Sequence, residues 1–163
     1  MIITTDEVKR LGRNISAHID KATLEALITE TEDMDIRPVL GAEFLRELSD
    51  SPKPEHDIIL NGGDYDYGYL SGLKKAVAYY VQAKFIRTND NQVSRYGLMQ
   101  KDSEYGYRSS TAERNALYND MCSIADKYMQ EVVNYLCHHS DVYPTYSKGR
   151  VRNNRTQYRV IGE

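Results

Sequence analysis

The sequence predicts a mainly α-helical protein: a small helical bundle of two long and two or three short helices, with an irregular mid-chain insertion and an extended C-terminal arm. Two stretches, residues 69–88 and 111–137, repeat apolar side chains at the spacing of one helix face. The stretches around them are shorter and are broken by Gly and Pro, which end regular structure. After residue 140 the helical spacing stops, so we expect a helical domain over residues 1–140 and an extended basic arm over residues 141–163.

The first two helices are predicted from their capping residues. Thr4 and Glu7 have the spacing of a capping box, and Gly12 is expected to end the short helix that they begin. Asp20 is expected to cap a longer helix, which Pro38 should bend or end because proline lacks a backbone N–H. Apolar residues recur at helical spacing along this second helix: Leu24, Leu27, Ile28, Met34 and Ile36.

The middle of the chain alternates one short helix with irregular segments. The run GAEFLRELSD, residues 41–50, has its apolar side chains on one face and is followed by a Pro-rich stop. Residues 51–69 are expected to form a loop, since NGGDYDYGY interleaves glycines with acids and aromatics. Residues 92–110 show no steady period and are compatible with one or two short strands or with an extended excursion.

The two long helices are expected to pack antiparallel and to form the core. Ser110 or Thr111 should cap the second of them, which has the most regular apolar spacing in the chain. The side chains expected to be buried between these helices are Val77, Val81, Ile124, Tyr128 and Val132. A charge at Ile124 should then unfold the domain, because an unpaired buried charge is strongly unfavourable.

Composition limits the class of protein. The N-terminal MIITTDEVKR has no signal-peptide pattern and no apolar run approaches the roughly 18 residues of a membrane span, so neither is expected. Cys122 and Cys137 are expected to be unpaired buried thiols, because about 22 Å separates them along one helix. The 14 tyrosines, beside two phenylalanines and no tryptophan, fit either an interface or a modest core in which Tyr replaces other aromatics.

The patterns that resemble chemical sites have simpler interpretations. His138 and His139 are expected at a helix C-terminus, where cations are favourable, rather than in a metal site. NGGDYDYG lacks the Gly-Lys-Ser/Thr of a phosphate-binding loop and the final carboxylate of a calcium loop. The acids of residues 25–35 run around a helix and are expected to be solvated. We therefore predict no catalytic, cofactor-binding or metal-binding residues, and a protein that is not an enzyme.

The charge is distributed unevenly along the chain. Of the 21 basic and 24 acidic side chains, five basic and one acidic follow residue 147, so a body of net charge −7 ends in a segment of net charge +4. Such a segment could dock on a partner, fold back on its own acidic body, or bind nucleic acid. The residues predicted to bind a partner are Tyr143, Tyr146, Lys148, Arg150, Arg152, Arg155, Tyr158 and Arg159. Alternation from Val151 to Ile161 would let the arm add a strand to another subunit.

Two blocks of sequence resemble one known class of protein. ITETEDMDIRPVLGAEFLREL resembles the helix–Leu-Gly–helix module of tailed-bacteriophage head–tail connector (adaptor) proteins. The positions that carry the resemblance are Asp33, Ile36, Pro38, Leu40, Gly41, Phe44 and Leu45. GLKKAVAYYVQAKFIRTND, with Val93 to Leu98 after it, looks like the later part of these proteins. LNGGDYDYGYLSGLKKAVAYY is most similar to versions from phages and prophages of Bacteroides-type hosts, including crAss-like phages. The resemblance covers about residues 4–137.

The resemblance implies a structural virion protein without a cofactor. Such adaptors form a ring, typically of twelve copies, below the portal protein, and join the capsid vertex to the next ring of the neck or tail. They line the channel through which genomic DNA passes without sequence specificity, and they assemble in the host cytoplasm. The acidic segment from Asp64 to Tyr69, or residues 92–108, would then lie at a ring interface or in the lumen.

Two other classes of function stay open. One is a nucleic-acid-binding regulatory protein that uses the basic C-terminal tail, for which salt-dependent DNA binding would be the sign. The other is an enzyme or ligand-binding domain around NGGDYDYG, for which a ligand-induced rise in melting temperature would be the sign.

Overall fold

The computed structural model describes residues 1–16, 19–66, 68–88, 91–94, 97–100 and 110–146, with only the backbone for residues 91–94 and 97–100. It is mainly helical, as the sequence predicts. The helices are α1 (Thr5–Leu11), α2 (Lys21–Thr31), α3 (Arg37–Leu40), α4 (Ala42–Asp50), α5 (Asp57–Asn61), α6 (Leu73–Thr88) and α7 (Thr111–His138). A π-helical turn (Glu32–Ile36) joins α2 to α3, and a 3-10 turn (Pro54–His56) precedes α5.

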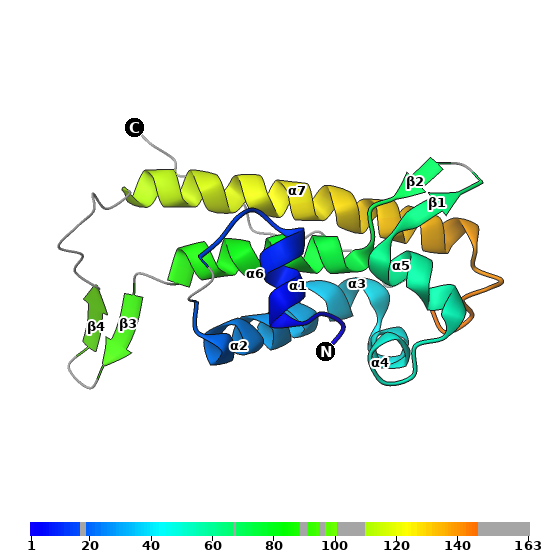
Figure 1. The fold of residues 1–163 in the computed structure, drawn as a ribbon, viewed down its shortest axis with the longest axis horizontal. Coiled ribbons are helices and arrows are strands. Elements are labelled where there is room, and N and C mark those ends of the chain that lie inside the picture. The colour runs from blue at the N-terminus through cyan, green and yellow to red at the C-terminus, as the bar shows by residue number, and fades with distance from the viewer. Residues whose placement is uncertain (17–18, 67, 89–90, 95–96, 101–109, 147–163) are drawn as a thin grey trace.

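The longest helices, α6 and α7, run antiparallel along the length of an elongated molecule (Figure 1). Helix α6 is the centre of the fold, because side chains are buried around nearly its whole circumference. Its buried residues are Leu73, Ala76, Val77, Ala78, Tyr80, Val81, Gln82 and Ala83. A helix that is covered all round must have neighbours on every side, and α1, α2 and α5 supply them opposite α7.

Helix α7 buries a slightly different face from the predicted one. Val132 is fully buried, but Ile124 and Tyr128 are only half-buried. The prediction that Ile124 and Tyr128 are buried between the long helices is wrong. The face of α7 that packs on the core carries Met121, Ala125 and Met129 instead, so Ile124 and Tyr128 lie at its edge. Of the two predicted caps, Ser110 is the one observed, and it forms a capping box with Glu113.

The caps predicted for the first two helices are confirmed. Thr4 Oγ1 accepts a hydrogen bond from the Glu7 N–H at 3.3 Å, and Asp20 accepts one from the Thr23 N–H at 2.8 Å. Helix α1 then ends at Gly12, where a Cβ atom would lie 2.4 Å from the side chain of Gln82. The fully buried Gln82 holds this end of α1. It donates to the Val8 and Arg13 carbonyl oxygens at 3.0 and 2.9 Å and accepts from the Arg13 N–H at 2.8 Å.

Pro38 distorts the second helix without ending it, which is one of the two outcomes expected of it. The helical path runs through the π-helical turn and α3 to Leu40, and Pro38 lies in the first turn of α3. Proline cannot donate an N–H, and its ring collides with the carbonyl four residues earlier in a regular α-helix. The wider π-helical turn immediately before Pro38 makes room for the proline ring and changes the hydrogen-bond pattern where the N–H is missing.

Residues 51–69 contain more regular structure than the predicted loop. Helix α5 and the hairpin of β1 (Gly63–Tyr65) and β2 (Gly68–Leu70) lie here, and β2 takes residues that were expected to begin the first long helix. The hairpin leaves and re-enters the helical body at Gly62 and Gly72, which have φ angles of 83° and 90°. A Cβ at Gly62 would lie 2.4 Å from the Leu70 carbonyl oxygen, so the close approach of the two chain segments requires glycine.

The two hairpins lie at opposite ends of the molecule. The hairpin of β3 (Asn91–Ser94) and β4 (Gly97–Gln100) lies beyond the end of α6, while β1 and β2 lie beside its beginning (Figure 1). This places short strands in the predicted irregular insertion, of which residues 101–109 are outside the described part of the chain.

Candidate functional site

The residues predicted to bind a partner fall into two groups. Tyr143 and Tyr146 are buried against the chain's own core, with 3% and 7% of their surface exposed. The prediction that these two tyrosines anchor a partner is therefore wrong. The others lie outside the described residues: Lys148, Arg150, Arg152, Arg155, Tyr158 and Arg159.

The segment after α7 folds back as compact turns rather than as the predicted extended chain. The Val142 and Tyr143 N–H groups both donate to the His139 carbonyl oxygen, at 3.0 and 3.3 Å, and the Tyr146 N–H donates to the Tyr143 carbonyl oxygen at 3.0 Å. We call residues 139–146 the C-terminal anchor, because they fix the start of the basic arm to the body. The helical body therefore extends to Tyr146 instead of ending at residue 140.

Aromatic rings form the apolar side of this anchor. The fully buried Phe44 of α4 lies at the centre, with its ring centroid 5.9 Å from His56, 6.1 Å from Tyr143 and 5.8 Å from Tyr146. These edge-to-face contacts are favourable geometries for aromatic pairs. The burial raises the pKa of Tyr146 to about 12 and also raises the pKa of Tyr143. Both hydroxyl groups therefore stay protonated over the physiological pH range.

Polar contacts complete the anchor. The Tyr143 hydroxyl donates to the Glu55 carbonyl oxygen at 2.9 Å. The Glu47 carboxylate of α4 binds Lys53 Nζ at 2.5 Å and accepts a hydrogen bond from Thr145. The bonds from Lys53 and Thr145 together hold the pKa of Glu47 below its ordinary value. Glu47 therefore links the loop after α4 to the C-terminal anchor as a carboxylate.

The paired histidines lie at the end of α7. Their Nδ1 atoms lie 2.7 Å from the Asn134 carbonyl oxygen for His138 and 2.9 Å from the Tyr135 carbonyl oxygen for His139. Because carbonyl oxygens only accept, each Nδ1 carries its hydrogen and caps the helix end. Within the described residues, no three His, Cys, Asp or Glu side chains are grouped so that they could hold a metal ion.

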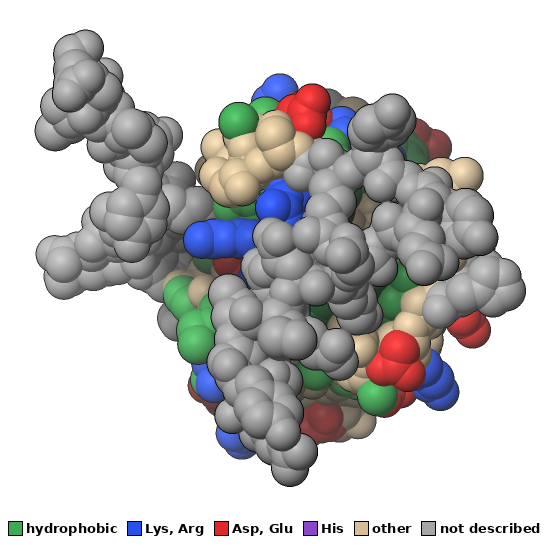
Figure 2. Space-filling view, turned by 90° about the vertical axis from the view of Figure 1, so that its left-hand side faces the viewer, with side chains coloured by type: hydrophobic (Ala, Val, Ile, Leu, Met, Phe, Trp, Pro, Cys, Tyr) green, Lys and Arg blue, Asp and Glu red, His purple; other side chains and the backbone are tan. Residues whose placement is uncertain are grey.

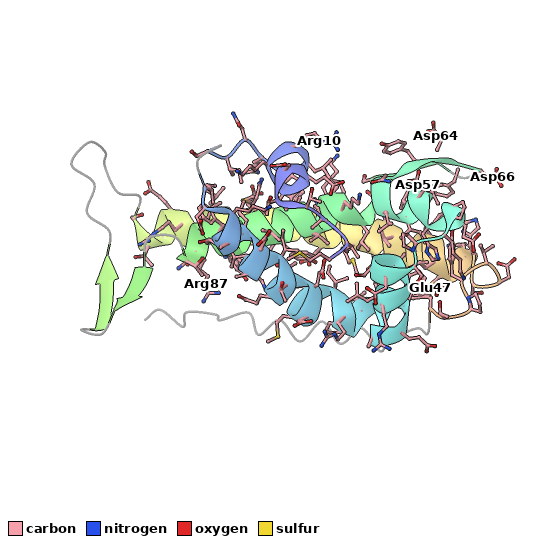
Figure 3. All side chains as sticks on the ribbon, turned by 60° about the horizontal axis from the view of Figure 1, so that its bottom comes forward. Arg10, Glu47, Asp57, Asp64, Asp66 and Arg87 are labelled. Carbon is pink, nitrogen blue, oxygen red and sulfur yellow. The ribbon has the colours of Figure 1, made fainter. Side chains whose placement is uncertain are left out.

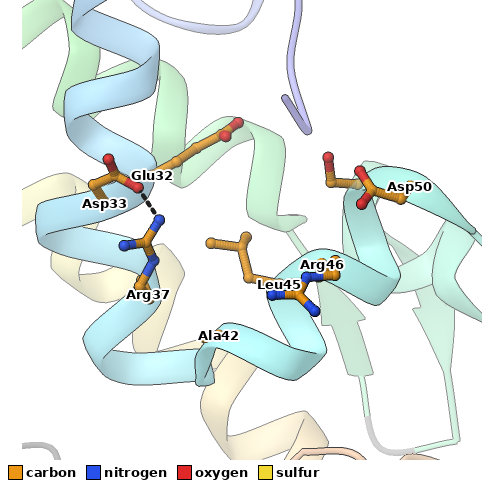
Figure 4. Close-up of a pocket in the computed structure, with 8 residues that line it drawn as sticks. Glu32, Asp33, Arg37, Ala42, Leu45, Arg46 and Asp50 are labelled. Atoms are coloured by element: carbon orange, nitrogen blue, oxygen red, sulfur yellow. Dashed lines mark hydrogen bonds and ion pairs between the residues drawn. The ribbon is translucent and has the colours of Figure 1, made fainter.

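An open pocket of about 400 Å³ lies at the corner between α3 and α4 (Figure 4). Its lining residues are Glu32, Asp33, Arg37, Ala42, Leu45, Arg46, Ser49 and Asp50. Asp33 pairs with Arg37, and Glu32 accepts the Ile2 N–H at 2.7 Å. Arg46 and Asp50 are exposed and have no ion pair with any described residue.

The β1–β2 hairpin has one face on the body and one face in solvent. Tyr65 packs edge-to-face on Tyr135 of α7, with ring centroids 5.2 Å apart, and Leu70 is buried. Asp64 and Asp66 project outwards (Figure 3), and 64% of the surface of Tyr69 is exposed. The acidic segment of the sequence is thus a hairpin with an exposed acidic and aromatic face.

Charges elsewhere on the described surface are mixed. Seen from the end at which α7 begins, acidic and basic side chains are interspersed (Figure 2). Lys84 of α6 lies between two acids, 3.1 Å from Glu30 and 3.0 Å from Asp35. Burial acts to lower the pKa of Lys84, but the bonds and charges of these acids outweigh it and raise the pKa above its ordinary value.

Sequence reasoning overlooked three residues that organise these surfaces. His56 is buried and its Nδ1 accepts the Lys53 N–H at 3.1 Å. Gln82 is buried at the end of α1, and Glu47 holds the anchor. The apolar run of Ile58–Leu60 between polar residues was the available signal for α5, whereas a single buried polar residue leaves no periodic signal.

The structure shows a small, mainly helical protein. Its C-terminal anchor packs on the core, an open pocket lies beside α4, and the β1–β2 hairpin has an exposed polar face. Residues 36–156 match the family described as "Family of unknown function (DUF6712)", and the chain belongs to this family. No curated protein and no solved structure matches the chain. Among the described helices, none combines the length and the apolar character that crossing a membrane requires.

Proposed function

We propose that this chain is a structural virion protein: a head–tail adaptor that forms a ring below the portal protein and joins the capsid vertex to the neck or tail. In this role it binds further copies of itself, the portal protein and the next neck or tail ring. Genomic DNA passes through the ring without sequence-specific contacts. The protein acts as a connector in the virion rather than as an enzyme, and it needs no cofactor.

The observation that carries this proposal is the C-terminal anchor. Tyr143 and Tyr146 fix the beginning of a segment of net charge +4 to one end of an elongated body of net charge −7. Opposite net charges on the segment and on the body favour contact between the segment of one subunit and the body of another. Such head-to-tail contacts close into rings when the rotation between subunits permits it.

The acidic body supports the passage of DNA. A net negative surface repels the phosphate backbone, so DNA can slide along it without being retained. The resemblance of residues 33–45 to the adaptor module supports the same role. The apolar positions of this stretch, Ile36, Leu40, Phe44 and Leu45, are buried in the core, and Asp33, Arg37 and Ala42 line the open pocket at the surface.

The test is assembly with the portal protein of the same virus. Purified chain should be measured by mass photometry and negative-stain electron microscopy, alone and after mixing with portal rings. We expect ring-shaped density added to one face of the portal. Absence of any association with portal, together with tight salt-dependent binding of the isolated chain to DNA, would overturn the proposal in favour of a nucleic-acid-binding regulator.

A further inference from the structure

We infer that neighbouring copies in the ring meet through a paired polar contact: Asp64 and Tyr69 of one copy against Arg46 and Asp50 of the next. The inference rests on the proposed ring and names the surfaces by which a second copy binds.

The hairpin supplies one half of the contact. Asp64 and Tyr69 are opposite each other in the β1–β2 register, so their side chains are on the same face. That face is exposed, because Tyr65 and Leu70 are on the inward face. Neither Asp64 nor Tyr69 has a hydrogen bond or ion pair with another described residue through its side chain. The hairpin therefore presents a carboxylate acceptor next to a phenol that can donate.

Helix α4 supplies the other half. Arg46 and Asp50 are one turn apart on its exposed face and line the pocket beside the buried Leu45 (Figure 4). The other charges of the pocket are engaged, as Asp33 pairs with Arg37 and Glu32 binds the N-terminal backbone. The order Arg then Asp along a helix is the less favourable orientation for an internal pair. Arg46 and Asp50 are thus available as a donor and an acceptor for another molecule.

The two halves match in spacing and in chemistry. Opposite residues of an antiparallel hairpin have Cβ atoms about 4.5–5.5 Å apart, and residues one helical turn apart have Cβ atoms about 5–6 Å apart. One docking orientation therefore brings Asp64 to the Arg46 guanidinium and the Tyr69 hydroxyl to the Asp50 carboxylate. The first contact is a charge-assisted hydrogen bond and the second buries an otherwise exposed aromatic ring at the pocket.

The positions of the two halves suit a ring. The hairpin and α4 lie at the same end of the long axis of the molecule but on opposite edges (Figures 1 and 3). When the hairpin edge of one copy meets the α4 edge of the next, neighbouring copies are not displaced relative to each other along the long axis. The contact uses different surfaces on the two copies, so every subunit can both give and receive it, as a closed ring requires.

Charge exchange between copies tests the contact directly. Asp64→Arg alone gives a copy with arginine on both halves, and Arg46→Asp alone gives a copy with aspartate on both halves. Each single variant should lower the yield of rings on portal about tenfold or more, since every contact becomes repulsive. Mixing equal amounts of the two variants should restore rings. In alternating copies, the arginine introduced in one variant faces the aspartate introduced in the other, and the next contact is the unchanged pair of Asp64 and Arg46.

Matched controls separate this effect from a general change of charge. Asp6→Arg and Arg10→Asp make the same changes at exposed positions of α1, away from both halves, and rings should form normally. Circular dichroism should show that all variants fold, since every substituted side chain is exposed. If wild-type protein forms rings and the single variants do so equally well, or if the mixture is not restored, this contact is refuted while the adaptor function stands. If wild-type protein forms no ring with portal, the proposed function fails, and the contact with it.

Discussion

Among individual residues, the face of α7 that is buried decides which substitutions unfold the protein. Val132 has no exposed surface, whereas Ile124 is half-buried and has access to water. Val132→Asp should therefore abolish cooperative folding, because an unpaired buried carboxylate costs several kcal/mol, a large part of a stability of about 5–15 kcal/mol.

Ile124→Asp is the matched control, since it places the same charge on the same helix. We expect a folded, helical protein with a modest loss of stability in urea denaturation followed by far-UV circular dichroism. Equal loss of structure in both variants would contradict the observed orientation of α7.

Glu47 makes the C-terminal anchor sensitive to acid. Its pKa is lowered, first by the hydrogen bond from Lys53 and then by that from Thr145. The folded protein therefore binds a proton at Glu47 less readily than the unfolded chain does. The stabilisation is complete above the ordinary glutamate pKa of 4.5 and is lost as the pH falls through the lower, folded-state pKa.

The variant Glu47→Gln keeps a hydrogen-bond acceptor but loses the titration. We expect the free energy of unfolding to fall less steeply for this variant than for the wild type between about pH 5 and pH 3. Other carboxylates with lowered pKa values, Glu7, Asp20 and Glu113, are present in both proteins and cancel in the comparison. Identical slopes would show that the Glu47 bonds contribute nothing in solution.

At the level of elements, the features that were predicted correctly are those that depend on residues close together in the sequence. The capping box at Thr4, the cap at Ser110 (one of two caps predicted for α7) and the apolar face of α4 depend on residues three or four apart, and the structure shows all three. The rotation of α7 about its own axis decides whether Ile124 or Ala125 faces the core. The sequence could not predict this rotation, because the two residues are adjacent and both apolar.

Interactions across long sequence separations account for the elements that were missed. The C-terminal anchor looks extended in sequence, but it is held in turns by Phe44, Glu47 and Glu55, which are 88 to 99 residues away. Tyrosines were expected either at an interface or in the core, and the structure shows both environments: Tyr143 is buried and Tyr69 is exposed. Only the fold distinguishes them.

The packing of α1 on α6 gives a prediction for these elements. Gln82→Leu removes three hydrogen bonds to the end of α1 and leaves the Arg13 N–H and carbonyl without their buried partner. We expect a loss of about 2–3 kcal/mol in the free energy of unfolding, since unmade buried hydrogen bonds cost about 1–3 kcal/mol.

Lys74→Met provides the comparison, because it removes the 2.8 Å ion pair to Glu7 between the same two helices while its partly exposed position limits the cost. We expect a loss of no more than about 1 kcal/mol there. Urea denaturation of both variants measures the difference. A smaller effect for Gln82→Leu than for Lys74→Met would mean that α1 is not held by the buried glutamine.

For the whole molecule, the question is where the folded body ends and the arm for assembly begins. The sequence suggested a boundary at residue 140, but Tyr143 and Tyr146 belong to the core. Two truncations separate the alternatives. Removal of residues 147–163 leaves the anchor intact, whereas removal of residues 141–163 exposes Phe44 and its aromatic neighbours.

We expect the shorter truncation to keep the melting temperature of the full chain within a few degrees. The longer one should lose about 3 kcal/mol or more, because each buried aromatic side chain contributes roughly 1.5–3 kcal/mol. That loss corresponds to a fall of roughly 6–12 °C in melting temperature for a chain of this length. Differential scanning calorimetry measures both.

The same two proteins then locate the contribution of the arm to assembly. If the basic segment contacts the neighbouring subunit or the portal, the protein lacking residues 147–163 should be fully folded and yet associate with portal rings more weakly, with a reduced dependence on salt. Because its anchor and its Asp64, Tyr69, Arg46 and Asp50 surfaces are unchanged, this loss can be assigned to the removed segment alone. Undiminished assembly of this truncated protein would leave the paired contact between hairpin and α4 as the main connection of the ring and would exclude the arm from it.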